Sequence, residues 1–334
     1  MTIVNMDSIR ESLHHLETII TAIGRQPPPA QKAACLIAQM PVEIVLLLAG
    51  DLPLENQLVL AQTCRAFYAL LRRTRDARRT RKQHIHYLAC IARDMPSHWV
   101  CGTCAKLHRD HPDDVPWTTL HNRCRLGWLW DNCVRSLNCS KIQYNHHHIQ
   151  LALKRLEVLL SPVYGRCPTS SSTLANKGIV WPKVVGGRFL IFTKIHYYPD
   201  AAYSYAPVTP DNLDVKSLCQ HQHFYPSCFV PTEEQLRSQT KYKIWATVLE
   251  AFEAGGKEVS GSCRQCRLDM SFQATPEHAT LRVWRDFGPE GSPLDLDWEV
   301  FTNRNLLVTE TLTVPYDEPG SVRRLYETVE RGHD

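Results

Sequence analysis

The fold of the N-terminal part is decided by the stretch Met40-Pro41-Val42-Glu43-Ile44-Val45-Leu46-Leu47-Leu48-Ala49-Gly50-Asp51-Leu52-Pro53-Leu54. A second stretch follows closely, Leu58-Val59-Leu60-Ala61-Gln62-Thr63-Cys64-Arg65-Ala66-Phe67-Tyr68. Together they predict three short helices with more apolar surface than so small a unit can bury alone. A helix that is apolar all round must be covered on two sides. One side can pack on its own protein, and the other invites a partner.

The spacing of these residues resembles an F-box. The family pattern begins with Leu/Met-Pro-x-Glu-Ile, which stands here as Met40-Pro41-Val42-Glu43-Ile44. It continues with Leu-Pro, here Leu52-Pro53, and ends with Leu-x-Leu-Ala-x-x-Cys-Arg-x-Phe-Tyr, here residues 58–68. We therefore assign residues 38–82 to an F-box.

F-box proteins dock onto the Skp adaptor of a Skp–cullin–F-box ubiquitin ligase and present a substrate through the rest of the chain. The resemblance implies a non-catalytic substrate receptor that binds the Skp adaptor, through it a cullin ligase, and a protein destined for ubiquitination. The side chains expected to meet the adaptor are Pro41, Ile44, Leu48, Leu52, Pro53, Leu58, Leu60, Cys64 and Phe67.

Size and composition are those of an ordinary globular protein. With 334 residues, 43% of them hydrophobic and 22% charged, the chain is long enough for two domains. A net charge of +4 does not by itself indicate a nucleic-acid or membrane partner. Charged residues interrupt positions 1–20, which excludes a signal-peptide core there, and no apolar run is long enough to span a bilayer. We expect a cytoplasmic or nuclear protein.

Two segments flank the F-box. In residues 1–29, apolar residues at spacings of three and four predict an amphipathic helix that ends before Pro27-Pro28-Pro29. This helix either packs on its own domain or forms a short coiled coil. After the F-box, Arg72–Lys82 is strongly basic. The run is typical of a solvated helix face, with a nuclear-localisation or nucleic-acid patch as the alternative.

Residues 83–334 predict a C-terminal α+β domain with antiparallel hairpins. A helix continues to before Pro96, and Trp99–Trp130 is expected to be loop-like. Val184–His196 predicts a hairpin around Gly186-Gly187, and Leu268–Phe287 predicts a second one by its alternation of apolar and polar residues. Thr232–Glu253 predicts one long helix. The whole chain is thus expected to be all-α first and mixed α/β afterwards.

Cysteines and histidines suggest that this domain is zinc-stabilised. There are 13 cysteines and 16 histidines, and thiols of an intracellular protein are more often metal ligands or buried side chains than disulfides. Tetrahedral zinc takes four such ligands. The first candidate set is Cys219, His221, Cys263 and Cys266, and a second candidate site is Cys101, Cys104 and His108. The alternative is that these are buried thiols without metal.

Further fragments are similar to F-box proteins of filamentous fungi that carry C-terminal Cys/His pairs. They are Tyr87–Pro96, Trp99–His108, Cys263–Cys266, and Trp284–Gly288 with Ser292–Asp295. This likeness covers much of the chain but implies no particular substrate.

Other functions find weaker support in the residues. A zinc-stabilised nucleic-acid-binding or protein-interaction module that uses the basic run 72–82 is the alternative function. A metalloenzyme would need an open metal position and a general base, which nothing in the sequence marks. The run His146-His147-His148 is expected to be polar surface, because consecutive side chains on a helix point in different directions.

Overall fold

The computed structural model divides the chain into two compact units, residues 1–91 and 92–334. The structure describes residues 40–76, 78–111, 133–135, 143–154, 163–166, 174–200, 205–213, 218–219, 221, 243–263, 265–302, 314, 316 and 318–328. The predicted helix and proline linker of residues 1–29 lie outside these ranges. The division falls within a helix, nine residues after the end that the sequence assigns to the F-box.

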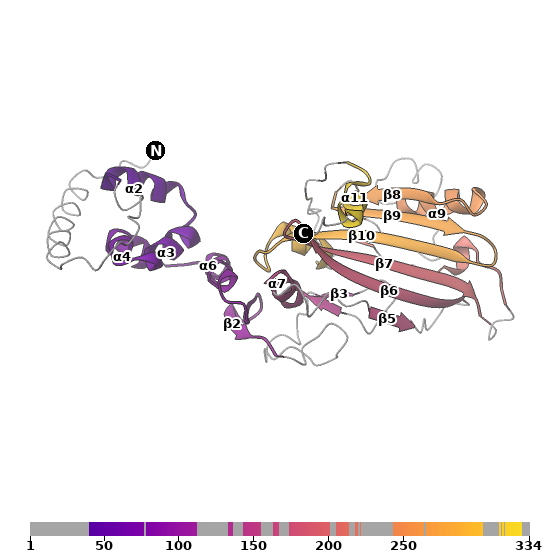
Figure 1. Ribbon diagram of the computed structural model, residues 1–334, viewed down its shortest axis with the longest axis horizontal. Coiled ribbons are helices and arrows are strands. Elements are labelled where there is room, and N and C mark those ends of the chain that lie inside the picture. Colours follow the sequence, from indigo (N-terminus) through magenta and orange to yellow (C-terminus); the bar gives the residue numbers. More distant parts are fainter. Residues whose placement is uncertain are drawn as a thin grey trace, which may run out of the picture. The chain divides into compact units, whose positions relative to one another are not determined.

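Three short helices open the first unit, as the sequence predicts (Figure 1). They are α2 (Val42–Asp51), α3 (Leu54–Thr63) and α4 (Arg65–Leu70). Pro41 and Pro53 stand at the N-caps of α2 and α3, where a fixed φ and a missing N–H are harmless. Cys64 is extended, with φ −157°, and separates α3 from α4.

The core of this unit is small. Ala49, Ala61 and Leu71 form it, with Leu60 packed against them. The basic run folds into α5 (Arg72–Asp76) and the start of α6 (Arg81–Arg93). The expected helix before Pro96 is therefore confirmed.

The second unit is built on a six-stranded antiparallel sheet with the order β5-β6-β7-β10-β9-β8. Its strands are β5 (Val163–Arg166), β6 (Leu174–Val185), β7 (Arg188–Pro199), β8 (Val259–Cys263), β9 (Leu268–Ala274) and β10 (Ala279–Pro289). Both predicted hairpins are present. Between β6 and β7, Gly186 and Gly187 have φ of +55° and +71°, which a two-residue hairpin turn requires at both positions.

Alternation along the strands gives the sheet two different faces. One face carries the main core, to which β9 contributes its even-numbered residues and β7 and β10 their odd-numbered residues. On this face α9 (Lys243–Glu253) covers β8 and β9. Further along the same face lie α7 (His146–Lys154) and α10 (Leu296–Thr302), with Phe189, Ile191 and Phe287 beneath them. The opposite face carries α11 (Ser321–Glu327) on Val185, Leu190 and Trp284. We call this second face the α11 face (Figure 1).

One expectation differs from the structure. Part of the segment expected to be loop-like is a hairpin, β1 (His98–Cys101) paired with β2 (Lys106–Arg109); its strands are too short for a period of two to be visible. The described part of the predicted helix 232–253 begins at Lys243, and residues 222–242 lie outside the described ranges. A third short pairing joins β3 (Cys133–Arg135) to β4 (Gln143–Asn145).

Candidate metal centre and exposed apolar surface

The C-x-x-C pair of the second unit lies in the tight turn between β8 and β9. Cys263 is the last residue of β8, and Cys266 precedes the start of β9 at Leu268. The backbone N–H of Leu268 donates to the carbonyl oxygen of Cys266 at 2.8 Å. Both cysteines have no exposed surface. The turn therefore holds two thiols at the inner end of a hairpin, pointing into the protein.

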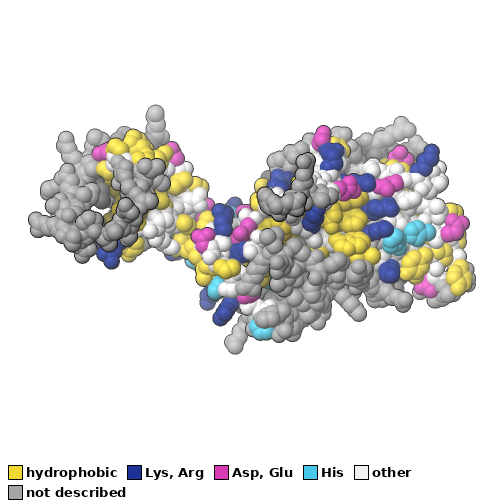
Figure 2. All heavy atoms as spheres, viewed as in Figure 1, with side chains coloured by type: hydrophobic (Ala, Val, Ile, Leu, Met, Phe, Trp, Pro, Cys, Tyr) yellow, Lys and Arg dark blue, Asp and Glu magenta, His cyan; other side chains and the backbone are white. Residues whose placement is uncertain are grey.

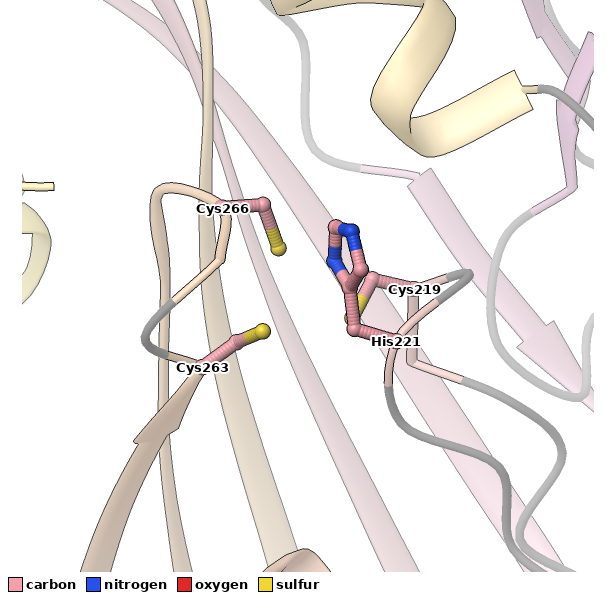
Figure 3. A group of neighbouring side chains, drawn as sticks. All are labelled: Cys219, His221, Cys263 and Cys266. Atoms are coloured by element: carbon pink, nitrogen blue, oxygen red, sulfur yellow. The ribbon is translucent and has the colours of Figure 1, made fainter. Parts of the chain in front are cut away.

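Cys219 and His221 meet this turn from a segment far away in the sequence. Both are buried, and Figure 3 shows their side chains directed at Cys263 and Cys266 from the opposite side. One ligand atom from each of the four residues lies within 4.8 Å of every other. Sulfur atoms bound to tetrahedral zinc at about 2.3 Å lie roughly 3.8 Å apart, which fits this spacing. The buried Cys3His group could hold a metal ion such as zinc.

The three thiols strongly affect one another's ionisation. Burial raises the pKa of Cys219, and hydrogen bonds with the other two thiols together with burial raise the pKa of Cys266. Hydrogen bonds from Cys219 and Cys266 lower the pKa of Cys263. A metal ion would replace the remaining protons, because only thiolates ligate it.

A buried arginine lies beside the cluster. Arg285 of β10 is 3% exposed, and its Nε donates to the carbonyl oxygen of Leu218 at 3.2 Å, next to Cys219 in the chain. Burial lowers the pKa of Arg285 to about 10, while the sulfurs of Cys219 and Cys266 raise it. The guanidinium thus keeps its charge at neutral pH. The sequence analysis missed Arg285, although a signal exists. Arg285 is two residues from both Val283 and Phe287, which face the core, so the alternation along β10 turns this charged side chain toward the core as well.

The second candidate group lies on the β1–β2 hairpin. Cys101 is buried, Cys104 and His108 are half-buried, and their ligand atoms lie within the same 4.8 Å limit. The N–H of Cys104 donates to the sulfur of Cys101 at 3.4 Å, and the sulfur of Cys104 is 3.0 Å from Nε2 of His108. Burial, and then the charges of His147 and Lys106, lower the pKa of His108 and favour the neutral ring that binds metal. Among the described residues this group supplies three ligands, one fewer than a closed zinc site needs.

The histidine run 146–148 is not polar surface, which corrects the expectation. His147 and His148 are buried at the start of α7. The Trp99 ring stacks with His147 and with His108, at centroid distances of 4.5 and 4.8 Å. His148 Nδ1 accepts from the backbone N–H of Asn145 at 3.1 Å. Stacking of His147 and helix capping by His148 thus give these side chains buried roles that the consecutive spacing does not indicate.

The expected adaptor residues divide into an exposed and a buried group. Ile44, Leu48 and Leu52 are 42%, 54% and 37% exposed. Pro41, Pro53 and Cys64 are also exposed, and Leu60 is half-buried. Leu58 and Phe67 are buried, so in this conformation they pack inside the unit and do not face a partner.

Exposed apolar side chains gather over α2 (Figure 2). Val45 and Ala49 point into the core, whereas the opposite side of the helix carries Ile44, Leu47 and Leu48. Leu47, at 68%, is the most exposed of the three and was not among the expected contacts. Its spacing of three from Ile44 was the available signal. We call Ile44, Leu47, Leu48 and Leu52 the apolar surface.

Comparisons with known proteins give no match: neither a family model, nor a curated protein, nor a solved structure matches this chain. The F-box likeness therefore rests on the residues quoted above. None of the described helices combines the length and hydrophobicity that crossing a membrane requires.

Proposed function

We propose that the protein is a substrate receptor of a Skp–cullin–F-box type ubiquitin ligase, with the first unit docking on the Skp adaptor and the second unit presenting a protein substrate. The observation that carries this proposal is the apolar surface. Its four residues lie within the F-box-like motif, on α2 and the residue that follows it.

The energetics of the surface favour a permanent partner. Covering a leucine or isoleucine side chain is worth about 1.5–3 kcal/mol, from which the cost of association must be subtracted. Four large apolar side chains on one helix and the residue that follows it exceed what scattered surface residues explain. Leu58 of α3 and Phe67 of α4 are buried within the unit and so are not part of this surface.

We further propose that the Cys3His group holds a structural zinc ion. Four protein ligands close the coordination shell, so the ion would join the β8–β9 turn to the segment around Cys219 without offering a position for a substrate. The protein then acts by binding, without chemistry of its own.

The test of the adaptor proposal is co-expression with a Skp adaptor, followed by size exclusion. Leu48→Asp places a charge in the apolar surface and should abolish the one-to-one complex. Leu296→Asp is the matched control, because Leu296 is 49% exposed but belongs to the second unit. Circular dichroism of each variant alone checks that it is folded.

A complex that is lost with Leu48→Asp and kept with Leu296→Asp supports the proposal. A folded, unchanged chain that ignores the adaptor overturns it, and so does a Leu48→Asp variant that binds as tightly as the unchanged chain. The basic run 72–82 receives no support as a nucleic-acid site. One of its members, Arg79, instead lies over the ring of Tyr87 at 5.2 Å.

A further inference from the structure

The α11 face of the sheet carries a group of basic side chains that α11 leaves uncovered. It consists of Lys177 of β6, Lys194 and His196 of β7, His278 of the β9–β10 turn and Arg282 of β10. Figure 2 shows basic side chains and histidines beside a hydrophobic band on the sheet. We call these five residues the cationic patch.

The patch is electrostatically unfavourable in the isolated protein. Lys194 and Arg282 are direct cross-strand partners, and so are Lys177 and His196. Like charges placed opposite each other destabilise a sheet. Within the described part of the chain, Arg282 meets Glu258 at 3.3 Å, but Glu258 also binds Arg323 at 2.8 Å, and neither Lys177 nor Lys194 has an ion pair. The patch thus retains an excess of positive charge.

The two histidines lie in the positive field of the same lysine and arginine side chains. Nδ1 of His196 lies 2.9 Å from Nε2 of His278, and the hydroxyl of Thr280 lies 3.1 Å from Nδ1 of His196. Burial and then the charges of Lys194, His278, Arg282 and Lys177 lower the pKa of His196 to about 4. A divalent cation is disfavoured here despite the two imidazoles, because three permanent cations surround them. An anion would relieve the repulsion.

An apolar row borders the patch. The rings of Trp181, Phe192 and Trp284 stack across three neighbouring strands, at centroid distances of 5.2 and 5.0 Å. Trp284 is buried beneath α11, whereas Trp181 and Phe192 are half-buried. Ile179 stands directly opposite Lys194. Residues two apart on a strand are about 7 Å apart and point the same way. An extended peptide has the same repeat, so it could place an acidic side chain over Lys194 and an apolar one over the half-buried ring edges of Trp181 and Phe192.

From this arrangement we infer that the cationic patch and its apolar border form a binding site for an acidic, extended polypeptide segment with alternating carboxylate and apolar side chains. Nucleic acid fits less well, because its bases need free aromatic faces. Both faces of Phe192 are covered by Trp181 and Trp284, and Arg323 lies over Trp284 at 4.8 Å. This inference rests on the proposed function in one respect: if the protein is a substrate receptor, the bound segment would belong to its substrate.

The test is binding of a fluorescein-labelled peptide of repeating Glu-Ser-Leu-Ser to the full chain, measured by anisotropy without any adaptor. Peptides with Gln or Lys in place of Glu are the matched controls, and a single-stranded oligothymidylate is the nucleic-acid probe. Lys194→Gln should weaken binding of the Glu peptide about tenfold, the loss of one charge-assisted contact. Lys257→Gln removes the same charge from an exposed turn outside the patch and should leave binding unchanged.

Binding of the Glu peptide that falls with salt, and that Lys194→Gln weakens selectively, supports the inference. It is overturned if the unchanged chain does not bind the Glu peptide, if Lys194→Gln binds equally well, or if oligothymidylate binds more tightly and depends on Lys194. Lys177→Gln repeats the test at an exposed position should Lys194→Gln not fold. Lost peptide binding with an intact adaptor complex contradicts only this inference, whereas a lost adaptor complex with intact peptide binding contradicts only the proposed function.

Discussion

Arg285 donates from Nε to the carbonyl oxygen of Leu218 at 3.2 Å, and so joins the middle of the sheet to the segment that carries two candidate ligands. The guanidinium also lies close enough to Cys219 and Cys266 for their charges to affect its pKa. Three thiolates and one imidazole around a divalent ion leave a net charge of about −1, because each thiolate carries one negative charge. With such an ion bound, Arg285 would supply the buried opposite charge.

Replacing Arg285 with Met should therefore weaken zinc binding. Removing one member of a buried charge pair costs about 3 kcal/mol, or on the order of a hundredfold in affinity. Arg285→Lys should restore part of that affinity, because it keeps the charge but loses the geometry of the hydrogen bond to Leu218. Competition with a chromophoric chelator measures both variants.

Arg282→Met in the same strand is the control, since Arg282 faces the other side of the sheet. Equal zinc affinity of Arg285→Met and the unchanged chain would show that Arg285 does not compensate the charge of the site.

Zinc binding should release protons and weaken as the pH falls. The pKa values of Cys219 and Cys266 are raised, so both hold their protons near neutral pH, whereas that of Cys263 is lowered. Binding should thus release about two protons, and affinity should fall by roughly a hundredfold per pH unit below neutrality. Calorimetry in buffers of different ionisation enthalpy counts the protons; a count near zero would contradict the thiol assignment.

The local part of this site could be predicted from sequence, and the long-range part less well. The C-x-x-C turn and the following hairpin are short-range patterns, and both appear in the structure. The candidate set also includes Cys219 and His221, but their approach to Cys263 across more than 40 positions is a long-range contact that the structure shows. Nothing local marks Arg285 as their neighbour, because its position follows from the order of the strands.

For the N-terminal helices, the sequence predicts the helices but not which of their side chains are buried. An apolar run predicts a helix covered on two sides, but it does not tell which side chains face inward. The rotation of α2 about its axis decides this: Val45 and Ala49 are buried, whereas Leu47 points into solvent. The sequence does not reveal the buried role of His147 in α7, because that role depends on Trp99 of the β1–β2 hairpin.

Asp269 should be essential for the attachment of α11. Its buried carboxylate accepts from the backbone N–H groups of Gly320 and Arg323, each at 2.9 Å, and from the hydroxyl of Tyr316. It thereby caps α11 from a neighbouring strand, where an anion is favoured by the helix dipole. Asp269→Ala leaves three donors without this acceptor and should cost about 3 kcal/mol of unfolding free energy.

Urea unfolding followed by tryptophan fluorescence measures this loss, because Trp284 lies beneath Arg323 of α11. Asp269→Asn should cost less than Asp269→Ala, since it keeps one acceptor oxygen. Asp211→Ala, in an exposed turn, serves as the control. An Asp269→Ala variant as stable as that control would show that α11 is held by its apolar contacts alone.

Lys194→Gln should make the isolated protein more stable even as it weakens binding of an acidic peptide. Lys194 stands opposite Arg282 and beside His196, so its removal relieves repulsion without breaking an ion pair of the described residues. The gain expected for a like-charge cross-strand pair is about 0.2–1 kcal/mol, visible as a small rise in Tm at low salt. Salt should shrink the difference in Tm, because it screens half-exposed charges.

If Lys194 serves binding, its replacement should raise the stability of the protein and lower its affinity for the acidic peptide. If Lys194 is purely structural, its replacement should lower Tm. Paired melts of Lys194→Gln and Lys257→Gln at low and high salt distinguish the two roles.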